Sequence, residues 1–194
     1  MRFVFIVSMS LLCLAAACQS PPAAAQGVDT AGRADLSAEL LAATITALDL
    51  EADGYRQKLA LARAGTGPAE NVDTFKSRVA FCERELERYH EMSPEAYPAP
   101  TGTTVPEKFG PVLPAVKREI AVTVRNGYAF GAQLDNDDAT RSGPFYRLAG
   151  IKGGCPCVLK AGSRYDLTVY LVYRREYFGF IQDCYVYVAE YRLR

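Results

Sequence analysis

Two runs of apolar residues at alternating spacings of three and four constrain the fold of this 194-residue chain more than any other feature. Such spacing places apolar side chains along one side of an α-helix, as in a heptad seam. The first seam consists of Leu41, Ile45, Leu48, Ala52, Tyr55, Leu59 and Ala62, and the second of Val72, Phe75, Val79, Cys82, Leu86 and Tyr89. Two seams this close together predict an antiparallel helical hairpin over residues 35–93.

Residues that favour caps and turns mark the ends of the two predicted helices. Asp35 is a candidate N-cap for the first helix, and Gly65 is a candidate C-terminal stop. Pro68 suits the first position of the second helix. Pro94 disfavours helical geometry in the residue before it, so we expect the second helix to end near this point.

The apolar pattern changes after a stretch that holds six prolines between residues 94 and 114. Such a stretch is typical of an extended linker, or of a strap across the next unit. Apolar and polar residues then alternate, as in Ile120, Val122 and Val124, which predicts β-strands. Five or six short strands predict an antiparallel β-sandwich or small barrel over residues 115–194. The expected fold class is therefore α+β.

Two turns are predicted within the strand region. Asn126 and Gly127 are the pair best suited to a two-residue hairpin, with a return strand over residues 128–134. The acidic run at residues 135–138 lacks the further ligand and the glycine that a calcium-binding loop needs, so we favour a polar turn.

The last predicted strand, near residues 184–193, has two different faces. One carries Cys184, Val186 and Val188, and the other carries Tyr185, Tyr187 and Tyr191. Aromatic rings pack well on sheets, and we favour core packing for the tyrosines. The alternative is that they form a docking surface for a protein or a glycan.

The N-terminal segment has the composition of an export signal. Arg2 supplies a positive charge, residues 3–17 form an apolar run, and small residues fill positions 15–17. The run is shorter than the about 20 residues of a membrane-spanning helix, and the pattern is typical of a cleaved signal peptide. Because Cys18 directly follows the small residues, the segment resembles a bacterial lipoprotein signal.

This resemblance implies that residues 1–17 are removed as a signal peptide and that Cys18 is acylated on its thiol and its new amino group. Several acyl chains hold a protein stably to a membrane. Residues 18–34 then predict a flexible tether. Gln19 stands where Asp retains such proteins at the inner membrane of enteric bacteria, which favours the outer membrane, facing the periplasm. The alternative, cleavage after Ala25, gives a secreted or soluble periplasmic protein.

Four further cysteines, Cys82, Cys155, Cys157 and Cys184, follow this region. An even number of cysteines in an exported protein predicts disulfides, and four allow three pairings. We expect Cys184 to bond to Cys155 or Cys157, with the other of these two pairing with Cys82 or remaining free. The alternative for Cys155 and Cys157 is a redox-active thiol pair or a Cu(I) site, because soft thiolates suit Cu(I).

Composition and motifs narrow the function classes. The chain has 22 basic and 22 acidic residues, so no large field points to a nucleic-acid partner. His90 is the only histidine, which rules out multi-histidine metal sites and argues against a Ser-His-Asp triad. We expect no catalytic residue, cofactor or resident metal. The sequence favours a lipid-anchored envelope protein that binds an envelope protein or glycan, with a thiol-dependent redox enzyme or Cu(I) chaperone as the alternative.

Overall fold

The computed structural model describes residues 30–66, 71–100, 112–126, 129–137, 145–177 and 180–194. The predicted signal peptide, Cys18 and the tether as far as residue 29 lie outside the described residues. Residues Ala31–Arg194 form a single compact unit. Within it, the helices and the strands share one apolar core.

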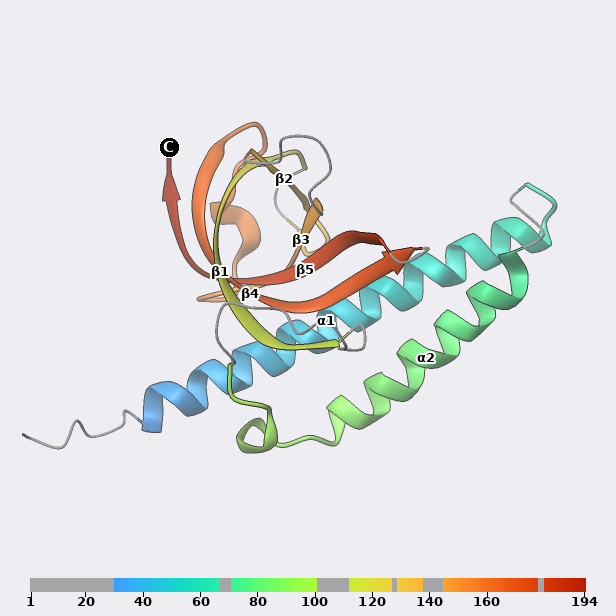
Figure 1. Ribbon diagram of the computed structural model, residues 1–194, viewed down its shortest axis with the longest axis horizontal. Coiled ribbons are helices and arrows are strands. Elements are labelled where there is room, and N and C mark those ends of the chain that lie inside the picture. Colours follow the sequence, from blue (N-terminus) through green and yellow to red (C-terminus); the bar gives the residue numbers. More distant parts are fainter. Residues whose placement is uncertain (1–29, 67–70, 101–111, 127–128, 138–144, 178–179) are drawn as a thin grey trace, which may run out of the picture. The chain divides into compact units, whose positions relative to one another are not determined.

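The helical part consists of α1 (Thr30–Arg63), α2 (Val72–His90) and the short 3₁₀ turn η2 (Pro94–Ala96). The strands are β1 (Val112–Val124), β2 (Gln133–Asn136), β3 (Phe145–Ile151), β4 (Arg164–Tyr177) and β5 (Phe180–Leu193), with the 3₁₀ turn η3 (Pro156–Val158) between β3 and β4. Figure 1 shows α1 and α2 side by side, with β4 and β5 lying along α1.

The two helices pair through the predicted seams as an antiparallel hairpin. Near the turn, the rings of Tyr55 and Phe75 lie 6.1 Å apart in a small apolar cluster of their own. Gly65 follows α1 with a φ of 74°, a backbone conformation that glycine adopts without a steric penalty. The spacing of the apolar residues therefore predicted the two helices, and Gly65 predicted where the first one stops.

The start of the first helix differs from the prediction. Because α1 begins at Thr30, Asp35 lies inside the helix and does not cap it. The last residues of the predicted tether are thus helical, and Pro68 lies outside the described residues. Neither helix, over the part of the chain that the structure describes, combines the length and hydropathy needed to cross a membrane.

The five strands belong to one sheet, whose pairing order is β1-β2-β3-β5-β4. Because β4 also pairs with β1, the sheet closes on itself. All of these pairings are antiparallel except that of β3 with β5. The fold is thus mixed α+β, with two helices ahead of a mostly antiparallel sheet. The predicted sandwich is not confirmed, because the described strands form one sheet.

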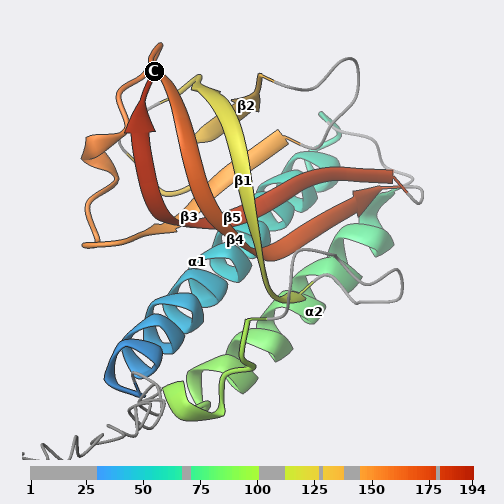
Figure 2. The same cartoon turned by 60° about the vertical axis from the view of Figure 1, so that its left-hand side comes forward.

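Alternation along the strands sends side chains into two separate cores. Cys184, Val186 and Val188 point into the interior of the closed sheet. Tyr185 and Tyr187 point outward and pack against the helical hairpin. The two faces of β5 in this region are those that the sequence predicted. Figure 2 shows the hairpin lying across the outside of the sheet.

Helix α1 approaches β3 closely because small residues meet at the contact. A Cβ atom at Gly150 would lie 2.9 Å from the Cβ of Ala43 and 2.9 Å from the ring of Tyr187. Only glycine fits this position without a shift of its neighbours. Helix α1 thereby buries two sides, one toward α2 and one toward the sheet.

The first part of the proline-rich stretch is fastened to the hairpin. Tyr97, which follows η2, is buried in the core that the helices share with the sheet. Its hydroxyl shares a hydrogen bond of 2.8 Å with the hydroxyl of Thr44 on α1. This part of the stretch is therefore a strap over the helices.

The predicted return strand after β1 was wrong in its bounds. The return strand β2 begins only at Gln133, and Val124 pairs with Leu134, so the connection from β1 is longer than a two-residue turn. The backbone N–H of Gly131 instead donates to a carbonyl of β3, which holds this connection against the next strand.

Candidate functional site

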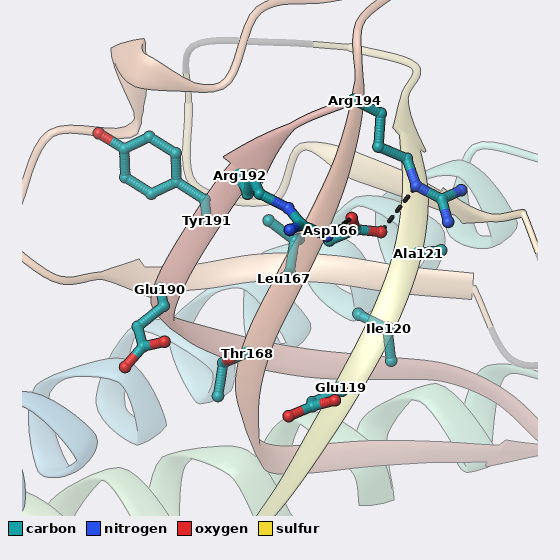
Figure 3. A pocket seen from close by; sticks show the side chains of 10 residues that line it. All are labelled: Glu119, Ile120, Ala121, Asp166, Leu167, Thr168, Glu190, Tyr191, Arg192 and Arg194. Atoms are coloured by element: carbon teal, nitrogen blue, oxygen red, sulfur yellow. Dashed lines mark hydrogen bonds and ion pairs between the residues drawn. The ribbon is translucent and has the colours of Figure 1, made fainter.

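A groove of about 650 Å³ lies on the outer side of β1, β4 and β5 (Figure 3). It is lined by residues 119–121, 166–168 and 190–192 together with Arg194. Two residues along β4 from Thr168, Tyr170 already packs against the core that the helices share with the sheet. The groove therefore occupies the part of the outer face where the cover of helices ends.

One row of side chains across the groove is acidic. Thr168 on β4 pairs with Glu119 on β1 and with Glu190 on β5, so the three side chains stand side by side. Both glutamates are exposed. Neither makes an ion pair or a hydrogen bond to another described residue. Figure 3 shows the two carboxylates on either side of Thr168.

In the next row, Arg192 and Arg194 both contact the carboxylate of Asp166. Asp166 accepts hydrogen bonds from Nη2 of Arg192 at 2.8 Å and pairs with Nε of Arg194 at 2.7 Å. The hydrogen bond from Arg192, together with the charges of both arginines, lowers the pKa of Asp166. Asp166 therefore stays ionised and holds the two guanidinium groups in place.

The groove is thus electrically polarised along the strands. Its first row carries the carboxylates of Glu119 and Glu190. Its second row carries the guanidinium groups of Arg192 and Arg194 on Asp166, and Nη1 of Arg194 also lies 3.8 Å from the carboxylate of Asp137. Burial against apolar walls does not dominate here, because five of the ten residues that line the groove are charged. Such an arrangement favours a small ligand that carries both signs of charge.

A β-bulge creates this groove, and sequence alternation did not reveal it. Thr168 pairs with Glu190 whereas Val169 pairs with Val188, so β5 carries one extra residue at this point. The extra residue reverses the faces of all the later residues of β5. Glu190 and Arg192 consequently turn outward into the groove.

The three tyrosines predicted as an alternative docking surface do not form one. Tyr185 and Tyr187 are each only 2% exposed. Their hydroxyls donate to Glu51 and Glu39 of α1, respectively. Core packing, which the sequence favoured for the tyrosines, is what the structure shows for Tyr185 and Tyr187. Helix α1 covers them because the apolar residues on its second side are buried against this face of the sheet.

Tyr191 lies on the opposite side of β5 from Tyr185 and Tyr187, because it follows the bulge. It pairs with Leu167, which faces the sheet interior, and its ring contacts Tyr165 at a centroid distance of 6.4 Å. Tyr191 is 47% exposed because it lies near the end of the sheet. The three rings therefore cannot act as a single surface.

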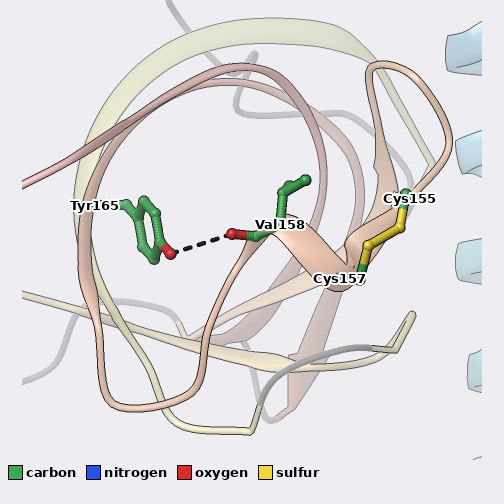
Figure 4. Close-up of a disulfide and its surroundings, with 4 residues drawn as sticks. All are labelled: Cys155, Cys157, Val158 and Tyr165. Atoms are coloured by element: carbon green, nitrogen blue, oxygen red, sulfur yellow. Dashed lines mark hydrogen bonds between the residues drawn. A yellow bond between two sulfur atoms is a disulfide. The ribbon is translucent and has the colours of Figure 1, made fainter.

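Cys155 and Cys157 form a disulfide with each other in the connection between β3 and β4 (Figure 4). Both residues are exposed. The connection is held at its far end by Tyr165, whose hydroxyl donates to the carbonyl of Val158 and accepts from the N–H of Lys160. The bond closes a ring of only three residues, so it restrains the chain locally and joins no distant elements.

The predicted bridge from Cys184 is therefore wrong. Cys184 is a free thiol inside the closed sheet, and Cys82 is a buried free thiol on α2. Burial raises the pKa of the Cys184 thiol to about 12 and that of Cys82 to about 11. Both thiols stay protonated at neutral pH and behave as small apolar residues.

A buried ion network joins α1 to the sheet. Glu51 on α1 accepts hydrogen bonds from Arg175 on β4, with Nε at 2.9 Å, and from the hydroxyl of Tyr185 at 2.8 Å. Arg175 also donates to Asp183 at 3.0 Å, and Arg147 donates to the same carboxylate at 3.1 Å. Burial alone would lower the pKa of Arg175, but the hydrogen bond and charge of Glu51 raise it overall.

The sequence held a weak signal for this contact. Leu40, Thr44, Ala47 and Glu51 form a second stripe on α1, spaced four, three and four. All four residues are buried. A glutamate that continues an apolar stripe indicates a buried charge with a partner on another element.

Comparison with known protein families, curated proteins and solved structures finds no match to this chain. Among the residues that the structure describes, no three His, Cys, Asp or Glu side chains cluster in a way that would hold a metal ion.

Proposed function

We propose that this chain is a lipid-anchored protein of a bacterial cell envelope that binds a partner without catalysing a reaction. The observation that carries the binding role is the charged groove on the uncovered outer face of β1, β4 and β5. The unpartnered carboxylates of Glu119 and Glu190 support it, because exposed charges aligned in a groove suit the recognition of a charged ligand. The signal segment and Cys18 support the location.

The anchoring part of the proposal is tested by metabolic labelling with radioactive palmitate. The full chain is expected to incorporate label, and the variant Cys18→Ser is expected to lose it. Cys13→Ser is the matched control and keeps the label, because Leu12 before it does not fit a cleavage site. Label that persists in Cys18→Ser contradicts acylation at this residue. Fractionation of the envelope then distinguishes the outer membrane from a soluble periplasmic location.

The binding part is tested by placing a photo-cross-linking residue at Thr168 in cells that express the full chain. We expect a discrete cross-linked species that disappears when Glu119 and Glu190 are both changed to Gln. The matched control carries the same cross-linker at Glu87, an exposed position on α2. Equal products from both positions would count against a binding role for the groove.

The exposed disulfide favours one second candidate function, that of a thiol-dependent redox enzyme or Cu(I) chaperone. Thiol–disulfide exchange requires access to the sulfur atoms, which the exposure of Cys155 and Cys157 allows. After reduction with a dithiol, the two thiols could serve as soft ligands for Cu(I). Insulin reduction and Cu(I) titration against a chelator test this function, with the double change to Ser as control. Activity that is lost in the double variant would favour this candidate.

The closed sheet also fits a finer description. We infer that it is a small barrel, because five strands with β5 returning between β3 and β4 suit the five-stranded Greek-key barrels of the OB type. Barrels of this type bind many kinds of ligand, so the likeness assigns no partner.

A further inference from the structure

We propose that the groove binds short zwitterionic peptides, with the peptide ammonium between Glu119 and Glu190 and the peptide carboxylate on Arg192 and Arg194. This inference rests on the proposed binding function and narrows it to one class of ligand. It follows from the separation of charge between the two rows of side chains in Figure 3.

The acidic row offers three acceptors to an ammonium group. Neighbouring strands are about 4.8 Å apart, so Glu119 and Glu190 start about 10 Å apart with Thr168 midway between them. Glutamate side chains extend far enough to approach a group held above Thr168. An ammonium group has three N–H donors, which two carboxylates and one hydroxyl can accept together.

The basic row offers donors to a carboxylate. Asp166 takes one short contact from each guanidinium group, at Nη2 of Arg192 and at Nε of Arg194. Nη1 of Arg194 also lies 3.8 Å from the carboxylate of Asp137. Each guanidinium has five N–H donors, so others remain for a ligand. Because Asp166 holds both groups, a ligand carboxylate meets oriented donors, an arrangement that strengthens charge-assisted hydrogen bonds.

The distance between the rows matches a short peptide. Successive outward residues on one strand are about 7 Å apart, since each residue advances the strand by about 3.3 Å. The arginine side chains reach further along the groove from the second row. An extended peptide of two to three residues spans about 7–10 Å. The groove volume of about 650 Å³ accommodates such a ligand.

The same charges disfavour other ligand classes. A polyanion would meet the carboxylates of Glu119 and Glu190, and an apolar molecule would displace water from charged groups without replacing their hydrogen bonds. A purely cationic ligand would leave the remaining N–H donors of Arg192 and Arg194 without an acceptor from the ligand. Only a ligand with both charges satisfies both rows.

The test is an NMR titration of the full-length chain in detergent micelles with triglycine, N-acetyl-triglycine and triglycine amide. We expect saturable binding of triglycine, with shift changes centred on residues 119–121, 166–168 and 190–194. Acetylation removes the ammonium and amidation removes the carboxylate, so each blocked peptide should bind at least about tenfold more weakly. These two peptides test both ends of the groove without any change to the protein.

Variants test the residues. Glu119→Gln combined with Glu190→Gln should weaken triglycine at least about tenfold and leave N-acetyl-triglycine unaffected, because that peptide lacks the group they bind. Glu87→Gln on the outer side of α2 is the matched control and should change neither peptide. Retained native NMR dispersion shows that each variant is folded.

Equal binding of triglycine and its blocked forms, shift changes elsewhere, or no saturation at millimolar concentrations would overturn the proposal. The binding function is judged separately by the cross-linking at Thr168. If that cross-link depends on Glu119 and Glu190 but triglycine does not bind, the ligand class is wrong and the groove remains a binding site.

Discussion

Glu51 is the residue on which the contact between helix and sheet depends most. It is 1% exposed, and its carboxylate is held by Arg175 and by the hydroxyl of Tyr185. A buried charge without a partner is costly, whereas replacement of both partners by apolar residues is often tolerated. The network therefore specifies how α1 sits on the sheet, whatever its net contribution to stability.

Glu51→Ala should lower the free energy of unfolding by about 3–5 kcal/mol, because Arg175 loses its main partner. Urea denaturation followed by circular dichroism measures the loss. The matched control is Glu83→Ala, which removes an exposed pair with Arg56 and should cost less than about 1 kcal/mol. The double variant Glu51→Leu, Arg175→Leu should regain part of the loss. A change below about 1 kcal/mol in Glu51→Ala would show that the network is dispensable.

The two buried thiols predict how stability depends on alkaline pH. The ordinary pKa of the thiol is 9.0, and burial raises that of Cys82 to about 11 and that of Cys184 to about 12. The folded state thus favours the protonated thiol, whereas the unfolded chain ionises first. The stability that these thiols contribute is fully present below pH 9.0 and is lost as pH rises through the folded-state values.

Unfolding free energies at about pH 8 and about pH 10 should therefore differ more in the natural chain than in the variant with Cys82→Ala and Cys184→Ala. Iodoacetamide mapping at neutral pH supplies a second readout, since neither thiol should react until denaturant is added. An identical pH dependence in the two chains, or rapid alkylation of the folded protein, would contradict the burial of these thiols.

At the scale of elements, α1 is the centre of the fold because it packs on both α2 and the sheet. The contact with β3 requires the absence of a side chain at Gly150, where a Cβ would lie 2.9 Å from Ala43. By contrast, Gly54 lies within α1, and a Cβ added there would have no atom of another described element within 4 Å. A side chain at residue 150 would therefore clash with its neighbours, whereas one at residue 54 would have open space.

Gly150→Ala should lower the free energy of unfolding by about 1–3 kcal/mol, because the helix must move away from the sheet. Gly54→Ala should raise it by up to about 1 kcal/mol, because alanine favours the helix and finds open space. Thermal and urea unfolding measure both variants. A neutral Gly150→Ala variant would mean that α1 does not approach β3 closely.

At the scale of the whole molecule, the helices and the sheet share an apolar core. Leu40 and Leu48 of α1, Leu86 of α2, Val172 of β4 and Tyr187 of β5 all belong to it. An apolar core common to two parts of a chain makes their unfolding cooperative.

The helices and the sheet should accordingly unfold in a single transition. Far-ultraviolet circular dichroism follows the helices, and near-ultraviolet signals of the tyrosines packed on β4 and β5 follow their contact with the sheet. The two urea curves should coincide, and Glu51→Ala should shift both by the same amount. A hairpin that melts first, with the tyrosine signal unchanged, would contradict the shared core.

The sequence predicted those parts of the fold that depend on local periodicity. The two heptad seams indicated the hairpin, Gly65 its turn, and alternation the two faces around Cys184 and Tyr185. The predicted pairing of Cys184 failed because a disulfide depends on which loops and strands meet, and spacing along the chain does not encode this. The local pair of Cys155 and Cys157 formed in its place.

By itself, the sequence determined the types of the main elements and their order along the chain, because side-chain periods of 3.5 and 2 residues reflect helix and strand geometry directly. Only the tertiary structure decided that the sheet closes and that α1 covers Tyr185 and Tyr187. It also decided that a bulge near Ala189 orients the side chains of Glu190 and Arg192 toward the groove. One extra residue in a strand reverses every later side chain, and its position is set by the pairing with a neighbouring strand. That is why the candidate site emerged only from the assembled fold.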